Sequence, residues 1–296
     1  MRIVGFDYFI CILSINLNTA HRHYYQVSFS RFDMVTDAEL IECICDPILA
    51  SDSLPKFGGG RGVSLADWVE TRNNDPLYSI VGLNDPTIYT AHAGSSVMTS
   101  VYRQLGVGIE RLFRLISVSK DWINCSNPDE LKWTFVSSNG HNRELDLLIR
   151  RDMITDANKQ RQLYEIASMM GEPPPIEEFR GIVFEIRQGY QSADSKRVAG
   201  DTEIVSRARE EGLLGVVVIA SNSYNRGVIR NYRASGLPVL VPASGSEGNA
   251  GSCPYAFIND FLDYDLEAAF SRVGSTLRER ILGHLHTRLG LNATEE

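Results

Sequence analysis

The chain has 296 residues, of which 29 are basic and 37 are acidic, so its formal net charge is −8. This length allows one large domain or two small ones, and an apolar content of 43% can form a sizeable core. The negative charge lowers the expectation of a nucleic-acid partner without excluding one, because local charge matters more for binding than the total.

The cysteine and lysine content bears on the oxidation state of the thiols and on the number of candidates for a catalytic lysine. The five cysteines are odd in number and irregular in spacing, which predicts reduced thiols in a cytoplasmic protein rather than disulfides or zinc ligands. Lysine is scarce, so there are few candidates for a catalytic lysine. Most basic residues are arginines, whose planar fork suits phosphates and guanine edges, although genomic base composition explains the same bias.

Residues 1–33 form an atypical N-terminal extension. The apolar run at 9–16 is too short to cross a membrane, and Arg2 is the only early positive charge, which makes a poor signal peptide. The sequence after Met34 is typical of a capped helix start, so Met34 is an alternative to Met1 as the first residue. We therefore expect a cytoplasmic protein without a membrane partner.

The region at 34–96 is expected to combine a helix at 35–50 with loops that contain short elements, because 51–96 is rich in Gly, Pro, Asn and Asp. The run GGGRG at 58–62 lacks the preceding strand and following GK[ST] of a phosphate loop, so a flexible loop is favoured. Apolar residues at helical spacing then predict a helix at 97–116. Gly106 and Gly108 within it indicate close approach of another backbone.

Strand patterns begin near residue 131. Residues 131–138 alternate, Asn139-Gly140 is a strong hairpin signal, and 143–150 pairs back with Asp146 inside it. An insertion at 151–179, with a helix near 156–170, separates this hairpin from the next strand. The remaining expected elements are a strand at 181–189, a helix at 196–211, a doubly covered strand at 213–221, a helix at 225–235, a strand at 237–241 and helices within 255–290.

This order predicts an α/β fold with a mixed sheet, in which three meandering strands are joined to a fourth by a helical crossover. The expected core covers 97–245, including the insertion at 151–179. The region at 34–96 precedes it, and a C-terminal helical region at 246–296 follows it.

Two carboxylates are expected on adjacent strands: Asp146 on the second strand and Glu185 on the third. Such side chains can lie a few Å apart on one face, where burial strengthens their repulsion. A cation between them would relieve it, and oxygen ligands favour Mg²⁺. In the alternative interpretation, the two carboxylates face solvent on opposite faces or pair with arginines.

The strand order, Asp146, and the segment 184–197, FEIRQGYQSADSKR, resemble the PD-(D/E)xK nuclease core and the corresponding stretch of type II restriction endonucleases. The resemblance covers roughly residues 97–220, and its motif is short. It implies an αβββαβ core in which Asp146 and Glu185 hold Mg²⁺. Many members carry a glutamate on the preceding helix, a position that Glu110 matches.

The chain departs from this pattern at the lysine position, which is Arg187. Arginine stays protonated and cannot act as a base, but it can stabilise charge on a scissile phosphate. The lysine role then falls to Lys196 on the following helix. Alternatively, Asp194-Ser195-Lys196 is itself the DxK motif, although its neighbours are less apolar than those of a core strand.

Several donors near this segment are candidates for binding DNA phosphates or base edges: Gln188, Tyr190, Gln191 and Arg197. A solvated helix start explains the same residues without DNA. Arg226, Arg230 and Arg233, spaced about one helical turn apart, fit a phosphate-binding face and an ordinary exposed face equally well.

The resemblance implies a Mg²⁺-dependent, site-specific endonuclease that cuts double-stranded DNA within a type II restriction-modification system. A homodimer matching a palindromic site and a cognate DNA methyltransferase are then expected. The alternatives are a repair-type nuclease of the same fold and a non-catalytic, doubly wound α/β sensor or ligand-binding module. The last alternative leaves Asp146 and the segment at 184–197 unexplained.

Overall fold

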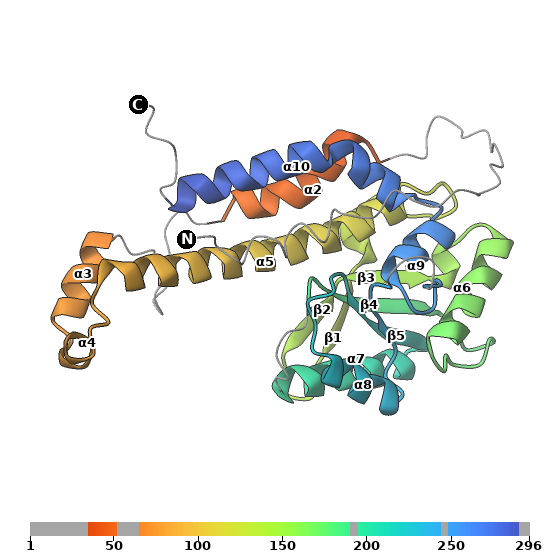
Figure 1. The fold of residues 1–296 in the computed structure, drawn as a ribbon. Coiled ribbons are helices and arrows are strands. Elements are labelled where there is room, and N and C mark those ends of the chain that lie inside the picture. The colour runs from red at the N-terminus through yellow and green to blue at the C-terminus, as the bar shows by residue number, and fades with distance from the viewer. Residues whose placement is uncertain (1–34, 52–64, 190–194, 244–247, 290–296) are drawn as a thin grey trace. The chain divides into compact units, whose positions relative to one another are not determined.

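The computed structural model describes residues 35–51, 65–189, 195–243 and 248–289 (Figure 1). The N-terminal extension, the choice between Met1 and Met34, and the run at 58–62 lie outside these ranges. The chain divides into two compact units, which we call the sheet unit (centred on Phe113–Gly274) and the helical unit (Asp37–Leu112 with Ser275–Glu296). Within the described ranges, no helix is long and apolar enough to cross a membrane.

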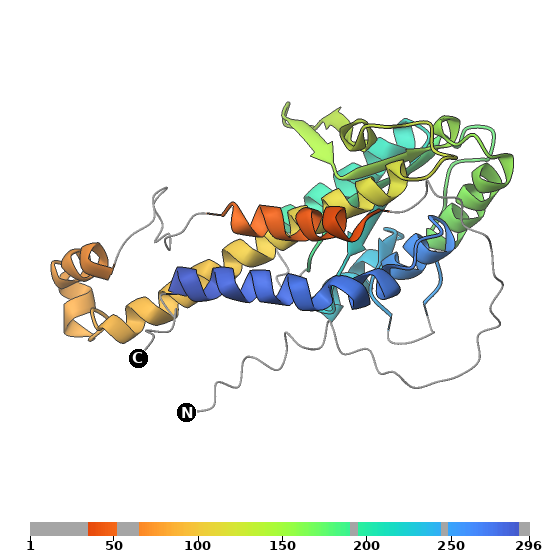
Figure 2. The same cartoon turned by 90° about the horizontal axis from the view of Figure 1, so that it is seen from above.

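The helical unit is built from α2 (Asp37–Leu49), α3 (Leu65–Asn73), α4 (Pro76–Ile80), the first part of α5 (Pro86–Val118) and the last part of α10 (Leu266–Leu289). In this unit α2, α5 and α10 run side by side in both views (Figures 1 and 2). Their apolar contact is a cluster of Ile48, Val97, Val101 and Leu285.

The short elements expected within 51–96 are present as α3 and α4, but the expected helix start at 97 is wrong, because α5 already begins at Pro86. The residues read as loop formers act here as helix starts. Pro76 is the first residue of α4, and the Asp75 carboxylate accepts from the amides of Leu77 (3.0 Å) and Tyr78 (3.2 Å). The same residue types serve in loops and in helix caps, so composition alone cannot separate them.

The prediction of a close backbone approach at Gly108 is confirmed. A Cβ atom at Gly108 in α5 would lie 2.8 Å from the carbonyl oxygen of Cys43 in α2. The missing side chain therefore allows these two helices of the helical unit to touch at this point.

The sheet unit contains β1 (Trp133–Val136), β2 (Asn142–Leu145), β3 (Leu147–Arg150), β4 (Gly181–Arg187), β5 (Leu213–Ile219) and β6 (Val239–Leu240). Strands β1 and β2 form an antiparallel pair, and the second sheet has the order β3-β4-β5-β6. In that sheet β3 is antiparallel to β4, whereas β4, β5 and β6 are parallel. The prediction of an α/β fold with a mixed sheet is therefore confirmed.

The hairpin forms as predicted: Gly140 has a φ of +79°, and its amide donates to the carbonyl of Ser137 at 2.8 Å. The expected strand at 143–150 is instead divided at Asp146 into β2 and β3. All seven residues of β5 are buried, which confirms the prediction of a doubly covered strand.

Four helices pack around this sheet: α6 (Ala157–Met170), α7 (Ser195–Glu210), α8 (Arg226–Ala234) and α9 (Pro254–Asp260). Figure 1 shows α7 and α8 together on one side. Val183 of β4 packs with Ile204 of α7, whereas Phe184 lies 5.1 Å from Phe257 of α9, measured between ring centroids. Because side chains alternate along a strand, Glu185 and Arg187 share the α7 and α8 side with Val183.

Candidate active site

Asp146 occupies the break between β2 and β3 and is fixed by both its backbone and its side chain. Its amide donates to the carbonyl of Phe184 at 3.2 Å, and its carbonyl accepts from Arg114 at 2.6 Å. Its Oδ2 accepts from the amide of Ile186 at 2.7 Å. The Asp146 side chain therefore accepts the hydrogen bond of a β4 amide that a backbone carbonyl of the neighbouring strand would otherwise accept. This replacement explains why the strand is interrupted here.

Glu185 of β4 lies close enough to Asp146 for the two charges to interact. The pKa of Glu185 is raised from 4.5 to about 7, first because burial disfavours the charged form and second because Asp146 repels it. The positive charges of Arg187 and Arg143 act in the opposite direction. The two carboxylates predicted to share one face are therefore brought together.

Arg187 lies between Glu185 and a third carboxylate, Asp201 of α7. Its Nη2 is 3.2 Å from Oε1 of Glu185 and also donates to Asp201. Asp201 is fully buried, and its Oδ2 accepts from the hydroxyl of Tyr232 in α8 at 2.6 Å. These contacts compensate a buried charge that would otherwise be costly, and they hold the guanidinium against Glu185.

Arg143 of β2 is a second cation in this cluster. Its Nη1 lies 3.4 Å from the carbonyl of Gly200 and 3.8 Å from Glu203. A Cβ atom at Gly200 would lie 3.0 Å from that guanidinium, so the glycine leaves room for it. Arg143 also lowers the pKa of Glu185, which places its charge near the acidic pair.

Sequence reasoning missed Asp201, Tyr232 and Arg143. A signal for Asp201 was present, because residues 201, 204 and 208 share one face of a helix, and Ile204 and Ala208 are buried on it. An aspartate on a buried helical face requires a partner. No comparable signal marked Tyr232, whose contact with Asp201 depends on how two helices pack.

The other predicted site residues have separate positions. Gln188 donates to the hydroxyl of Ser221 at 3.3 Å. Glu110 lies on α5 in the helical unit, whereas the acidic pair belongs to the sheet unit. Lys196 and Arg197 lie in the first turn of α7, but their side chains are outside the described part of the chain, as are Tyr190, Gln191 and Asp194.

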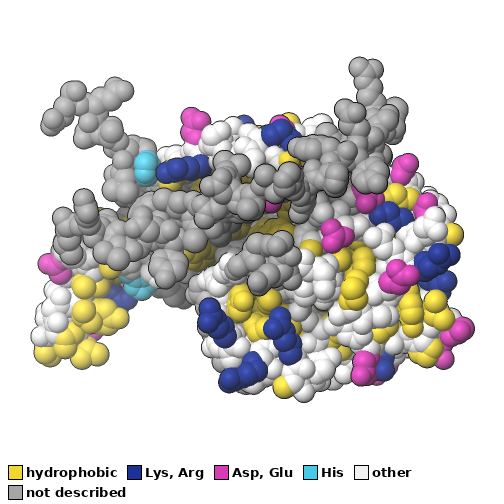
Figure 3. All heavy atoms as spheres, turned by 45° about the vertical axis from the view of Figure 1, so that its right-hand side comes forward, with side chains coloured by type: hydrophobic (Ala, Val, Ile, Leu, Met, Phe, Trp, Pro, Cys, Tyr) yellow, Lys and Arg dark blue, Asp and Glu magenta, His cyan; other side chains and the backbone are white. Residues whose placement is uncertain are grey.

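The predicted arginine triplet lies on the outer face of α8. Arg226, Arg230 and Arg233 are exposed, whereas Val228 and Ile229 on the same helix are buried. In the lower middle of Figure 3, Lys and Arg side chains gather without acidic side chains among them, in the part of the sheet unit where Figure 1 shows α7 and α8.

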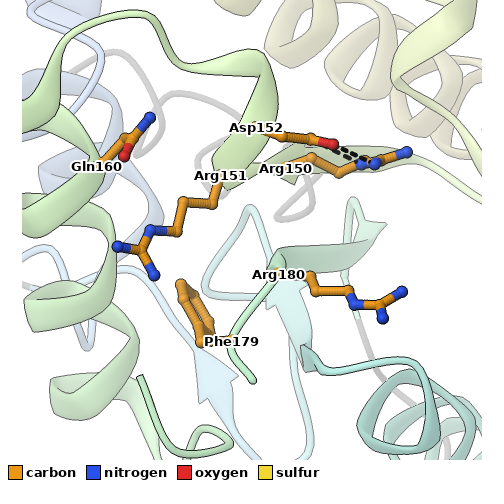
Figure 4. A pocket seen from close by; sticks show the side chains of 6 residues that line it. All are labelled: Arg150, Arg151, Asp152, Gln160, Phe179 and Arg180. Carbon is orange, nitrogen blue, oxygen red and sulfur yellow. Dashed lines mark hydrogen bonds and ion pairs between the residues drawn. The ribbon is translucent and has the colours of Figure 1, made fainter. Parts of the chain in front are cut away.

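A hollow of about 450 Å³ opens at the opposite end of β4, lined by Arg150, Arg151, Asp152, Gln160, Phe179 and Arg180 (Figure 4). Arg150 forms an ion pair with Asp152, and Arg151 donates to the carbonyl of Ile176 at 2.9 Å. Arg150 is paired with Gly181 at the start of β4, whereas Glu185 lies toward its end. The hollow is therefore separate from the acidic pair.

The donor chemistry at Asp146 and Glu185 fits a hard divalent cation, because a positive charge there would relieve the repulsion between them. Among the described residues, no group of three or more His, Cys, Asp and Glu side chains is arranged to hold a metal. Comparison of the chain with known protein families, curated proteins and solved structures finds no match.

Proposed function

We propose that the protein is a Mg²⁺-dependent, site-specific endonuclease for double-stranded DNA that belongs to a type II restriction system. The observation that carries this proposal is the juxtaposition of Asp146 and Glu185, with Arg187 held against Glu185 by buried Asp201. The element order α5, β1, β2, β3, α6, β4, α7, β5 is compatible with the αβββαβ order that the resemblance implies, when β2 and β3 are counted as one interrupted strand and α6 as the insertion.

In this proposal Asp146 and Glu185 would hold Mg²⁺, and the ion would supply positive charge to a phosphate oxygen and lower the pKa of bound water. In the hydrolysis, a water oxygen bonds to phosphorus while one P–O ester bond breaks, and the departing oxygen keeps the electron pair and takes a proton from solvent. Arg187 remains protonated and stabilises the charge that develops on the phosphate. Lys196 is the proposed acceptor of the water proton, provided that its pKa is lowered by neighbouring positive charge.

The proposed assembly is a cytoplasmic homodimer that binds a palindromic DNA site. Gln188, Tyr190, Gln191 and Arg197 are its proposed DNA contacts. A DNA methyltransferase of the same system would protect the host sites from cleavage.

The test is digestion of plasmid and phage DNA with and without Mg²⁺ by the wild type, Asp146→Asn and Glu185→Gln. We expect discrete fragments from the wild type in Mg²⁺ alone, and none from either variant. Asp152→Asn is the matched control, because Asp152 is an exposed carboxylate already paired with Arg150. Cleavage near the wild-type rate by Asp146→Asn or Glu185→Gln would show that these two carboxylates do not form the catalytic site.

The role of the positive group is tested separately by single-turnover cleavage of a mapped duplex across pH. Lys196→Ala should lose roughly 10²–10⁴-fold in rate if it removes the acid/base group. Arg187→Lys should keep partial activity, because it restores the lysine of the family pattern. An unchanged rate in Lys196→Ala with a dead Arg187→Lys would reverse the roles and leave Arg187 as the essential cation.

The alternatives predict different products. A repair-type nuclease would cut without discrete fragments, whereas a non-catalytic module would leave DNA intact in Mg²⁺. The parallel arrangement of β4, β5 and β6 favours the second alternative, because ligands of doubly wound folds bind at the carboxyl ends of such strands.

A further inference from the structure

Helix α8 has one face fixed against the sheet. Its start is capped by the side chain of Asn225, which accepts from the amides of Gly227 (2.9 Å) and Val228 (3.4 Å). Tyr232 and Ile229 are buried in an apolar cluster with β5 and β6. The packing of this inner face determines which side chains α8 presents to solvent.

The outer face carries Arg226, Arg230 and Arg233, which we call the α8 arginine row. Within the described ranges none of the three forms an ion pair with a carboxylate, unlike Arg150 with Asp152 or Arg207 with Glu210. Among the described residues these three arginines have no acidic partner, although the net charge of the chain is −8. The row is therefore a local surface that favours an anionic partner.

The spacing of the row matches a phosphodiester backbone. A helical rise of about 1.5 Å per residue places the first and last arginines about 10 Å apart along the axis. Successive phosphates of one strand in duplex DNA are about 3.4 Å apart along the duplex axis, so a row lying parallel to that axis spans about three phosphate-to-phosphate steps. Guanidinium groups also suit phosphate geometry, because they donate two hydrogen bonds in parallel.

Helix α8 is connected to the candidate active site at two places. Gln188, which follows β4, donates to Ser221 in the segment between β5 and α8 at 3.3 Å. On the inner face, the hydroxyl of Tyr232 donates at 2.6 Å to Asp201, which in turn binds Arg187. A strand bound to the outer face would therefore lie on an element attached to the site.

We infer that the α8 arginine row binds the phosphodiester backbone of duplex DNA, on the helix whose inner face is linked through Tyr232 and Asp201 to Arg187 of the candidate site. The inference rests on the proposed function for the identity of the polymer. Phosphate contacts fix the orientation of a protein on DNA without reading its sequence. The row therefore contributes affinity and placement, whereas sequence discrimination falls to other residues.

The test is equilibrium binding of a labelled DNA duplex to the full chain in EDTA, measured by fluorescence anisotropy over a range of salt concentrations. The variants are Arg226→Gln, Arg230→Gln, Arg233→Gln and the triple substitution. Each lost phosphate contact should reduce the slope of log K against log salt by about 0.9, so the triple variant should lose about 3. Because the side chains are exposed, the melting temperature should stay at the wild-type value.

Arg180→Gln is the matched control. Arg180 is exposed and forms no ion pair with another described residue, but it lies at the hollow beyond the start of β4 (Figure 4). It lies roughly 20 Å along the strand from Arg187, at about 3.3 Å per residue. We expect its slope to match the wild type. An equal reduction in Arg180→Gln would show a response to total charge and would overturn the assignment to α8.

An unchanged slope in the triple variant, or no binding of the duplex by the wild type, would also overturn the inference. The outcome is separable from that of the proposed function. Row-dependent binding without cleavage in Mg²⁺ would refute the nuclease and leave the DNA-binding surface standing. Cleavage by the wild type with an unchanged slope in the triple variant would support the nuclease and refute DNA binding by the α8 arginine row.

Discussion

At the scale of single residues, burial and neighbouring charge control the ionisation of Glu185. Its side chain is 19% exposed, and its pKa is raised to about 7. Between pH 4.5 and about 7 the folded state retains a proton that the unfolded state has released. The tighter binding of this proton stabilises the folded state. That stabilisation is fully present below the ordinary pKa of 4.5 and is lost as the pH rises through about 7.

We therefore predict that Glu185→Gln stabilises the protein at pH 8 but not at pH 5 when metal is removed. A tenfold change in proton affinity corresponds to about 1.4 kcal/mol, so the gain at pH 8 should be about 1–3 kcal/mol. Urea unfolding in EDTA at both pH values measures it, with Glu210→Gln as an exposed control. An equal effect of Glu185→Gln at both pH values would contradict the raised pKa.

In the proposed nuclease, Tyr232 and Asp201 would be positioning residues, because Asp201 contacts Arg187 and Tyr232 contacts Asp201. Tyr232→Phe removes the hydroxyl that donates to Asp201 and should cost about 1.5–3 kcal/mol of stability, the usual range for a hydrogen bond to a charged group. If the proposed nuclease activity is present, kcat should fall while KM changes little, since Arg187 acts on charge that develops in the transition state.

Tyr224→Phe is the matched control, because Tyr224 is partly buried against the same apolar cluster. Steady-state cleavage of a mapped duplex measures both constants, and urea unfolding measures stability. A rise in KM with unchanged kcat in Tyr232→Phe would indicate a role in binding. Equal losses in both variants would indicate a purely structural role.

At the scale of elements, helix α5 offers a comparison between two of its glycines. A Cβ at Gly108 would lie 2.8 Å from a backbone oxygen of α2, whereas a Cβ at Gly94 meets nothing within 4 Å. We predict that Gly94→Ala stabilises the protein by about 0.5–1 kcal/mol through helix propensity. Gly108→Ala should destabilise it, because overpacking typically costs about 1–3 kcal/mol and exceeds that gain. Thermal unfolding of both variants checks the prediction, and equal shifts would show that α2 yields readily at Gly108.

The elements that sequence predicted well are those whose signals are local. The alternation of 131–138, the Asn139-Gly140 turn and the apolar run of β5 each depend on neighbouring residues alone. The start of α5 at Pro86 was missed because helix caps and loops use the same residue types. Glu185 and Asp146 were found through strand pairing, but the contacts of Asp201 with Arg187 and Tyr232 require the packing of α7 and α8, which no local pattern encodes.

At the scale of the whole molecule, the question is how one candidate site per chain would cut two strands. A homodimer would place one site on each strand of a palindrome, so both strands would be cut in one binding event. We predict that the wild type converts supercoiled plasmid to linear DNA without accumulating nicked circles. Agarose gel electrophoresis of a time course distinguishes the two products.

Mixed dimers test this prediction directly. Wild-type chains co-purified with a large excess of Asp146→Asn chains would pair mostly with inactive partners, so each dimer could cut one strand only. Nicked circles should then accumulate, whereas an excess of Asp152→Asn chains should leave linear DNA as the product, because that carboxylate lies outside the site. Continued formation of linear DNA in the Asp146→Asn mixture, at a rate set by the wild-type chains alone, would show that single chains cut both strands in turn.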